Sequence, residues 1–304
     1  MQMEIRSATD PRVAELLAKL LEQDGVVELT RDAHVLPISP KECFVAYFVR
    51  GRKKGGHIPI GAVWLTEREG EPGTFEIALV TEGEHGSKHI VSELISIIAR
   101  VGASRQDISR LVARVTKAGD YAAHIMGLMG FYSQEAEVAN TSDNDTAELV
   151  RDYLRQAPKE GKPLFYLQDL TDAFETEGDF CTCYASLDTG EIEISFDETY
   201  VGDLDDAFDP DEDEGDWALL PDQRELDDWH TMRDFACLQE DKIANELLDQ
   251  LHMRGAYRRF KGTCADYDIL DEYFIYQGER YRQIAIEWVE DHNGVCRDGL
   301  RPRS

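Results

Sequence analysis

The amino-acid sequence predicts an α/β fold, in which a mixed, mostly antiparallel sheet flanked by helices is followed by an acidic α+β domain. Three observations predict it. Strand-like and helix-like periodicities alternate through the first half. A strand, a glycine-bearing turn and an amphipathic helix follow one another over residues 74–101. Residues 1–135 hold 16 Lys and Arg against 18 Asp and Glu, whereas residues 136–304 hold 16 against 43, so the net charge of −29 belongs almost entirely to the second half.

The first half has a local signal for each element. Apolar residues at helical spacing predict helices, and runs of apolar and β-branched residues predict strands. A basic, glycine-containing turn between the second and third strands predicts a hairpin, and Gly130 suits the left-handed residue that ends a helix. The predicted strands are 3–7, 43–49, 58–66, 74–80, 111–116 and from 131 onward, and the predicted helices are 10–21, 87–101 and 121–129.

A polar stretch separates the two halves, and we expect domains at residues 1–140 and 163–304 joined by a linker at 141–162 that includes a helix at 146–156. The second domain is predicted to hold a hairpin around Asp188-Thr189-Gly190. Its other predicted elements are helices at 167–174, 225–238, 241–253 and 279–290, and a segment at 269–276.

The acidic surface of the second half restricts the partners. It repels nucleic acid and anionic membranes, so we expect no direct binding to either. Cations, basic proteins or DNA-binding proteins are the partners that it suits, although plain solubility explains it as well. Nine of the fourteen residues from Asp203 to Asp216 are acidic, which predicts an exposed, mobile loop. Its spacing departs from that of calcium loops, and no metal site is expected.

The chain has no run of about 18 apolar residues and no apolar segment near its first residue, so we expect a cytoplasmic protein. The six cysteines are scattered, which favours reduced thiols in that compartment.

The segment from Thr74 to Arg100 carries the chemistry. Amide groups at the start of a helix are unpaired and carry partial positive charge, so a helix that follows a glycine turn suits a phosphate group. With the order of the elements around it and the closing Gly130-Phe131, this segment resembles the GCN5-related N-acetyltransferase (GNAT) family over about residues 3–135.

The resemblance implies acetyl-coenzyme A as the cosubstrate, held by the loop Gly83, Glu84, His85, Gly86, Ser87, Lys88. Gly86 matches the central glycine of the family pattern, whereas Gly83 replaces an Arg or Gln and Lys88 replaces a small residue. By the same pattern, the backbone of Leu79 and Val80 would pair with the pantetheine arm. The implied cofactor-binding residues are Leu79, Val80, Gly83, Gly86, Ser87 and Lys88.

The catalytic residues are less regular. The tyrosine that protonates the leaving thiolate in many family members is replaced by Met126, whose thioether donates no proton. Tyr121 is the candidate acid in its place, with His124 nearby, and Glu76 is the candidate base, with His85 as another. Glu76 and Tyr121 also have plainer interpretations. Glu76 would be the solvent-facing residue of a strand, and Tyr121 would be a packing or capping residue.

The second half resembles a bacterial family of acidic proteins that is still uncharacterised, over about residues 163–295. The resemblance rests on Asp227–Met232, Phe235, Gly255–Lys261, Tyr273-Phe274 and Trp288. Arg258 and Arg259 form its paired arginines, and we expect them to bridge to Asp227, Asp228 or Asp234.

Two functional hypotheses remain open. The first is an N-acetyltransferase that moves an acetyl group from acetyl-coenzyme A to an amine, on a small molecule or a protein. The second is a non-catalytic, degenerate acetyltransferase fold that acts as a binding or regulatory module, in which the acidic domain engages a basic or DNA-binding protein.

Overall fold

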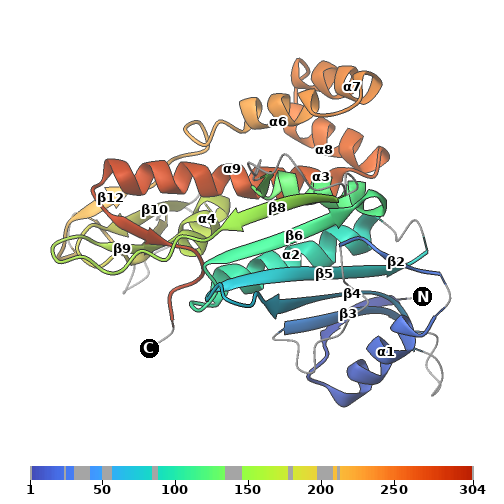
Figure 1. Cartoon of the computed structure of the whole chain (residues 1–304). Helices are drawn as coiled ribbons and strands as arrows, with labels where there is room; N and C mark the ends of the chain where they lie inside the picture. Colours follow the sequence, from blue (N-terminus) through green and yellow to red (C-terminus); the bar gives the residue numbers. More distant parts are fainter. Residues whose placement is uncertain are drawn as a thin grey trace, which may run out of the picture. The chain divides into compact units, whose positions relative to one another are not determined.

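The computed structural model divides the chain into two compact units, residues 1–153 and 154–304 (Figure 1). These are called the first and the second unit below. The structure describes residues 2–23, 25–30, 42–49, 57–83, 88–133, 146–176, 181–196, 208–210 and 213–302.

The first unit is built on one mixed, mostly antiparallel sheet, which confirms the predicted fold class. The strand order is β1-β3-β4-β5-β6-β8-β7, and only β5 and β6 pair in parallel along it. The predicted hairpin is β3 and β4. The strands are β1 (Gln2–Ser7), β3 (Glu42–Val49), β4 (His57–Glu67), β5 (Thr74–Glu82), β6 (Arg110–Thr116), β7 (Tyr132–Ser133) and β8 (Thr146–Asp152).

Helices cover both faces of this sheet. The apolar stripe of α1 (Pro11–Leu21) packs on Ala62, Trp64 and Val80, and Trp64 is fully buried there. The opposite face meets α2 (Lys88–Ser104), where Gly61 of β4 lies against side chains of that helix. A strand covered on both faces must be apolar at successive positions, which is why β4 and β5 read as nearly continuous apolar runs.

The parallel pair β5 and β6 is joined only at its beginning. Residues 74–76 pair with residues 110–112, and beyond them a further strand, β2 (Val26–Glu28), pairs antiparallel with residues 80–82 of β5. The space between the later parts of β5 and β6 is called the wedge below. Strand β2 was not predicted from the sequence, because three residues are too few to give a periodic signal.

The predicted helix at 146–156 is wrong, because residues 146–152 form strand β8. Ala147, Glu148 and Leu149 favour a helix locally, but β8 pairs with β6 over its full length, and Val150 is completely buried in the sheet. This strand belongs to the first unit, so the segment expected as a linker carries a part of the sheet.

Asp152 links three strands. Its carboxylate accepts hydrogen bonds from Arg110 Nε of β6 at 2.6 Å and from the Tyr132 hydroxyl of β7 at 2.6 Å. Burial alone would raise the pKa of Asp152, but these hydrogen bonds outweigh it and hold the pKa below its usual value. A lowered pKa means that the carboxylate stabilises the fold above its unfolded pKa, near 3.9, and that this contribution disappears as the pH falls through the folded pKa.

We therefore expect Asp152→Asn to be less stable than the wild type at pH 7, and the difference to shrink as the pH falls below about 4. Urea unfolding of both proteins between pH 3 and pH 7 measures it. A difference that is constant with pH would contradict the assigned ionisation.

The second unit combines small sheets with a set of helices. Strand β10 (Cys181–Ser186) lies between β11 (Ile192–Phe196) and β12 (Trp217–Leu219), and β9 (Leu164–Tyr166) pairs with β13 (Val295–Arg297). The helices are α4 (Leu167–Thr176), α6 (Asp228–Cys237), α7 (Asp241–Leu251), α8 (Ala256–Asp266) and α9 (Leu270–Asp291). The acidic α+β domain is thus confirmed as to class.

The last long helix differs from the prediction. The segments 269–276 and 279–290 were expected as separate elements, but they fall in the single helix α9, which begins at Leu270 and continues through Gly278. A glycine costs a helix about 1 kcal/mol relative to alanine, and the packing of α9 offsets that cost. Its inner side carries Tyr281, Trp288 and Val289 into a core shared with α4 and β10, while Tyr273 packs against Phe235 and Phe260.

The described part of the acidic segment is anchored at Phe208. This ring lies 4.6 Å from Trp217 and 5.7 Å from Tyr184, centroid to centroid. Asp213, Glu214 and Asp216 are exposed, as predicted. Residues 203–207, 211 and 212 lie outside the described residues. Among the described helices, none combines the length and the apolar character that crossing a membrane requires.

Candidate functional site

The wedge contains the backbone that the resemblance assigns to the pantetheine arm, and β2 is bonded to it. The Leu29 amide donates to the Leu79 carbonyl at 2.9 Å, and the Leu79 amide donates to Thr30 Oγ1 at 2.8 Å. Glu28 stands opposite Val80 in the β2–β5 register. Both backbone groups of Leu79 are thus already bonded within the chain.

The same segment also contacts β6. The Thr116 amide donates to the Leu29 carbonyl at 3.1 Å, the Thr116 hydroxyl donates to the Glu28 carbonyl at 2.8 Å, and Thr30 forms a bridge with Val115. Leu29 and Thr30 are buried. Residues 26–30 therefore fill the wedge from β5 to β6.

The predicted phosphate loop is described only at its two ends. Gly83 has a φ of +75°, a conformation that favours glycine, and its amide donates to the Gly25 carbonyl at 2.9 Å. Gly86 and Ser87, with Glu84 and His85, lie outside the described residues. Lys88 begins α2, and its ammonium lies 5.0 Å from the centroid of the Tyr121 ring.

Tyr121 lies in the first turn of α3 (Asp120–Leu128). Its hydroxyl is 3.0 Å from Ser92 Oγ on α2, and its ring centroid is 6.2 Å from that of His124. The structure thus brings Tyr121 and Lys88 together. Met126, at the position of the family's tyrosine, is completely buried in the same helix.

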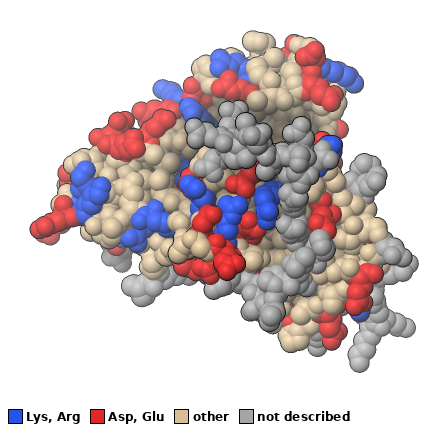
Figure 2. Space-filling model, in the orientation of Figure 1, with Lys and Arg blue, Asp and Glu red and all other residues tan. Residues whose placement is uncertain are grey.

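Glu76 belongs to an ion-pair cluster on the sheet. Its carboxylate oxygens lie 3.2 Å from Arg68 Nε and 3.0 Å from Arg114 Nη2, and Arg68 also pairs with Glu148 at 3.2 Å. Figure 2 shows basic and acidic side chains side by side in the middle of the face in view, over β5, β6 and β8. Glu76 and Tyr121 therefore have different sets of neighbours: two arginines surround Glu76, whereas Tyr121 contacts Ser92 and Lys88.

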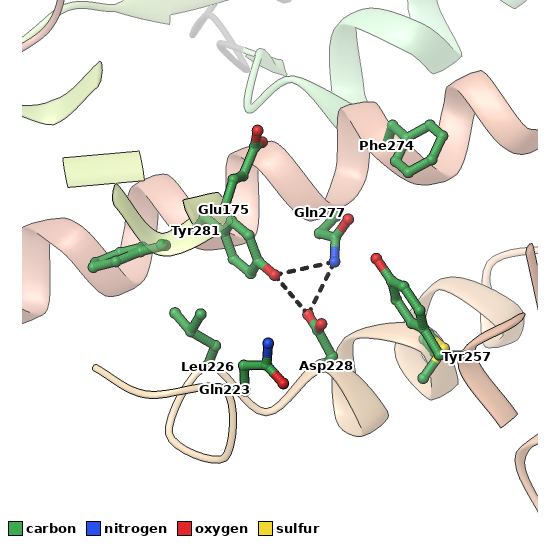
Figure 3. A pocket seen from close by; sticks show the side chains of 10 residues that line it. Glu175, Gln223, Leu226, Asp228, Tyr257, Phe274, Gln277 and Tyr281 are labelled. Atoms are coloured by element: carbon green, nitrogen blue, oxygen red, sulfur yellow. Dashed lines mark hydrogen bonds between the residues drawn. The ribbon is translucent and has the colours of Figure 1, made fainter. Parts of the chain in front are cut away.

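The second unit contains a cavity that was not predicted from the sequence. Its volume is about 580 Å³, within the range of small-molecule sites. Figure 3 shows Asp228 of α6 pointing toward Gln277 and Tyr281 of α9, with Tyr257 and Phe274 on the other side. The residues that line it are Phe174, Glu175, Gln223, Leu226, Asp228, Met232, Tyr257, Phe274, Gln277 and Tyr281.

The prediction that Arg258 and Arg259 form ion pairs with aspartates of the α6 region is wrong, because within the described residues the aspartates have other partners. Asp227 pairs with His230, Asp234 pairs with Arg233, and Asp228 accepts hydrogen bonds from Gln277 and Tyr281. The segments that contain Asp228 and Tyr257 were singled out by the resemblance of the second half to a family of acidic proteins. The sequence gave no information on which of their side chains meet.

Comparison with known proteins yields structural neighbours. No protein-family model and no curated protein matches the sequence. Solved structures similar to about half of this chain are GNAT-family acetyltransferases. A GNAT acetyltransferase from Streptococcus pneumoniae is 18% identical, with 50% of this chain and 99% of that chain covered and a TM-score of 0.34. A putative acetyltransferase from Salmonella typhimurium, solved with its cofactor acetyl-CoA, is 14% identical, with 53% and 99% covered and a TM-score of 0.33.

Proposed function

We propose that the first unit is a non-catalytic acetyltransferase fold and that the protein works as a binding module, in which the acidic second unit engages a basic protein partner. The observation that carries the proposal is the occupied wedge. The pantetheine arm would need the backbone of Leu79 and Val80. Val80 is paired with β2, and both backbone groups of Leu79 are bonded to the two residues that follow β2.

Displacing β2 is costly. A net hydrogen bond contributes about 0.5–1.5 kcal/mol, and a buried donor or acceptor that loses its partner costs about 1–3 kcal/mol. The Leu79 groups, the Thr116 amide and the Thr116 hydroxyl would all need new partners, and the buried side chain of Leu29 would be exposed. A coenzyme that enters the wedge must offset these losses with its own contacts.

The catalytic groups support the same proposal. Met126 supplies no proton at the position of the family's acid. Glu76 is held between Arg68 and Arg114, and a water that it activated would have to compete with these two guanidinium groups. The second half of the chain, with its large excess of acidic residues, supplies long-range attraction for a basic partner.

Acetyl transfer from acetyl-coenzyme A to an amine is the second candidate function. The hydroxyl of Thr81, in the part of β5 that borders the wedge, is buried without a hydrogen-bond partner among the described residues. A polar ligand in the wedge could satisfy it. The cluster of Lys88, Ser92 and Tyr121 at the beginning of α2 also favours this candidate, because a lysine at a helix start suits a phosphate.

Titration calorimetry with acetyl-coenzyme A separates the candidates. We expect no binding at millimolar coenzyme, because the wedge is filled. A peptide of eight lysines should bind the same protein, with an affinity that falls steeply between low and physiological salt. Saturable coenzyme binding would reject the non-catalytic proposal in favour of acetyl transfer, and failure of the lysine peptide to bind at low salt would reject the basic-partner role.

A further inference from the structure

The cavity of the second unit combines an apolar floor with a fixed carboxylate. Phe174, Leu226 and Met232 are almost fully buried and form the apolar part of its lining. The carboxylates in the lining belong to Asp228 and Glu175, and no lysine or arginine is among the residues that line it. An apolar pocket whose lining has carboxylates and no cationic side chain suits a ligand that has an apolar body and a positive charge.

The carboxylate of Asp228 is held at one oxygen. The Gln277 side-chain amide and the Tyr281 hydroxyl both donate to Oδ1, each at 2.9 Å, and Gln277 Nε2 also lies 3.2 Å from the Tyr281 hydroxyl (Figure 3). Gln277 and Tyr281 are buried on α9, so this triangle fixes the carboxylate. Oδ2 takes no hydrogen bond or ion pair within the described part of the chain.

Two aromatic rings line the cavity on the side of Asp228 opposite to Tyr281 (Figure 3). Tyr257 of α8 and Phe274 of α9 are 38% and 44% exposed, large values for aromatic rings beside a cavity. A lysine side chain of the chain itself already lies near both rings. The Lys261 ammonium, which does not line the cavity, lies 4.0 Å from the Tyr257 centroid and 5.6 Å from the Phe274 centroid. The electron-rich faces of this pair therefore accept an ammonium group in the chain itself.

We propose that this cavity binds an organic ammonium cation with a short alkyl body, with its charge between Asp228 Oδ2 and the rings of Tyr257 and Phe274, and its alkyl part against Leu226 and Met232. A trimethylammonium group fits this arrangement best, because it needs aromatic and carboxylate neighbours and no hydrogen-bond acceptor for each proton. This ligand class specifies what the acidic second unit recognises, and in that respect the assignment rests on the proposed function.

Glu175 supports the assignment. Burial raises the pKa of this carboxyl, and the nearby Asp172 raises it further. Both causes disfavour the charged form while the cavity holds no cation, and a bound ammonium would reverse the effect. Binding should therefore strengthen as the pH rises through the titration of Glu175.

Calorimetry of the full chain with choline and 3,3-dimethyl-1-butanol tests the proposal. The two molecules differ in a charged nitrogen against a neutral carbon, so they separate the charge from the shape. We expect choline to bind at least about tenfold more tightly than the alcohol. Equal affinities, or no choline binding at millimolar concentration, would overturn the proposal.

Variants locate the site. Tyr257→Leu and Asp228→Asn should each weaken choline binding by about tenfold. Asp228→Asn keeps an oxygen that accepts the hydrogen bonds of Gln277 and Tyr281. If this variant does not fold, Glu175→Gln, which removes the other carboxylate of the lining, takes its place in the binding measurement. Tyr267→Leu is the matched control: this tyrosine also has a lysine ammonium over its ring, Lys242 at 5.8 Å, but it does not line the cavity. Equal losses in Tyr257→Leu and Tyr267→Leu would overturn the assignment.

Further measurements distinguish a protein from a small molecule as the source of the ammonium group, and they separate failure of the cavity assignment from failure of the proposed function. A capped trimethyllysine that binds more tightly than choline indicates a protein partner, and the reverse order indicates a free small molecule. If the octalysine peptide binds but choline does not, the cavity assignment fails and the basic-partner role stands. If choline binds through Tyr257 and acetyl-coenzyme A binds as well, the non-catalytic proposal fails and the cavity assignment stands.

Discussion

Replacing Gly119 by alanine should loosen β2 and destabilise the first unit by about 2–3 kcal/mol, within the usual range for overpacking. A Cβ at Gly119 would lie 2.2 Å from the Leu29 carbonyl oxygen and 2.5 Å from Val115 Cγ1. The first of these atoms belongs to the backbone directly after β2, so relief of the clash requires this backbone and the turn at Gly119 to move apart. We expect lower stability in urea and faster hydrogen exchange at the amides of Leu29 and Thr116.

Gly127→Ala is the matched control for this change. Gly127 lies inside α3, and a Cβ there meets nothing within 4 Å, so the better helix propensity of alanine should stabilise the protein by up to about 1 kcal/mol. If both variants were equally stable, β2 would not lie as tightly against the turn before α3 as the structure shows. Coenzyme binding by Gly119→Ala but not by the wild type would show that β2 alone closes the wedge.

Asp298→Ala should cost the second unit about 3–5 kcal/mol, because it removes one partner of a buried ion pair. Asp298 is 3% exposed, and its carboxylate accepts hydrogen bonds from Arg282 Nε at 2.7 Å, Arg282 Nη2 at 2.9 Å and the Leu154 amide at 2.6 Å. Without it, the mostly buried guanidinium of Arg282 loses both of its hydrogen bonds to Asp298 and keeps its ion pair with Glu279. Urea unfolding monitored at the tryptophans measures the loss.

Asp234→Ala provides the comparison within the same unit. Asp234 pairs with Arg233 on the surface, and exposed pairs contribute little, so this variant should unfold at nearly the same urea concentration as the wild type. The double variant Asp298→Ala with Arg282→Met should recover part of the lost stability, since it also removes the mostly buried guanidinium that Asp298 pairs with. Equal, small effects of Asp298→Ala and Asp234→Ala would contradict the burial of the Arg282–Asp298 pair.

Much of the first unit followed from the sequence. The hairpin of β3 and β4, the strand-turn-helix unit from β5 to α2, and the left-handed glycine at Gly130, with a φ of +77°, were all predicted from local patterns. Such elements are set by apolar spacing and by the conformational freedom of glycine, which are properties of a few neighbouring residues. The uneven charge and the absence of the tyrosine at Met126 are likewise read directly from the residues.

The candidate site was predicted only in part. Tyr121 and Lys88 were singled out separately, and only the structure brings them together. The bonding of Leu79 to Thr30 and the ion pair of Glu76 with Arg114 likewise depend on segments that are distant in the chain. Asp228 likewise found its partners on α9 rather than in the paired arginines nearby.

The sequence by itself thus determined the class of the fold, the order of most of its elements in the first unit and the acidity of the second unit. Only the tertiary structure decided that residues 146–152 are a strand, that Gly278 lies inside a continuous helix, and that β2 fills the wedge. The physical reason is common to the three cases. Local propensities differ by about 1 kcal/mol or less per residue, and pairing or packing with distant segments outweighs them.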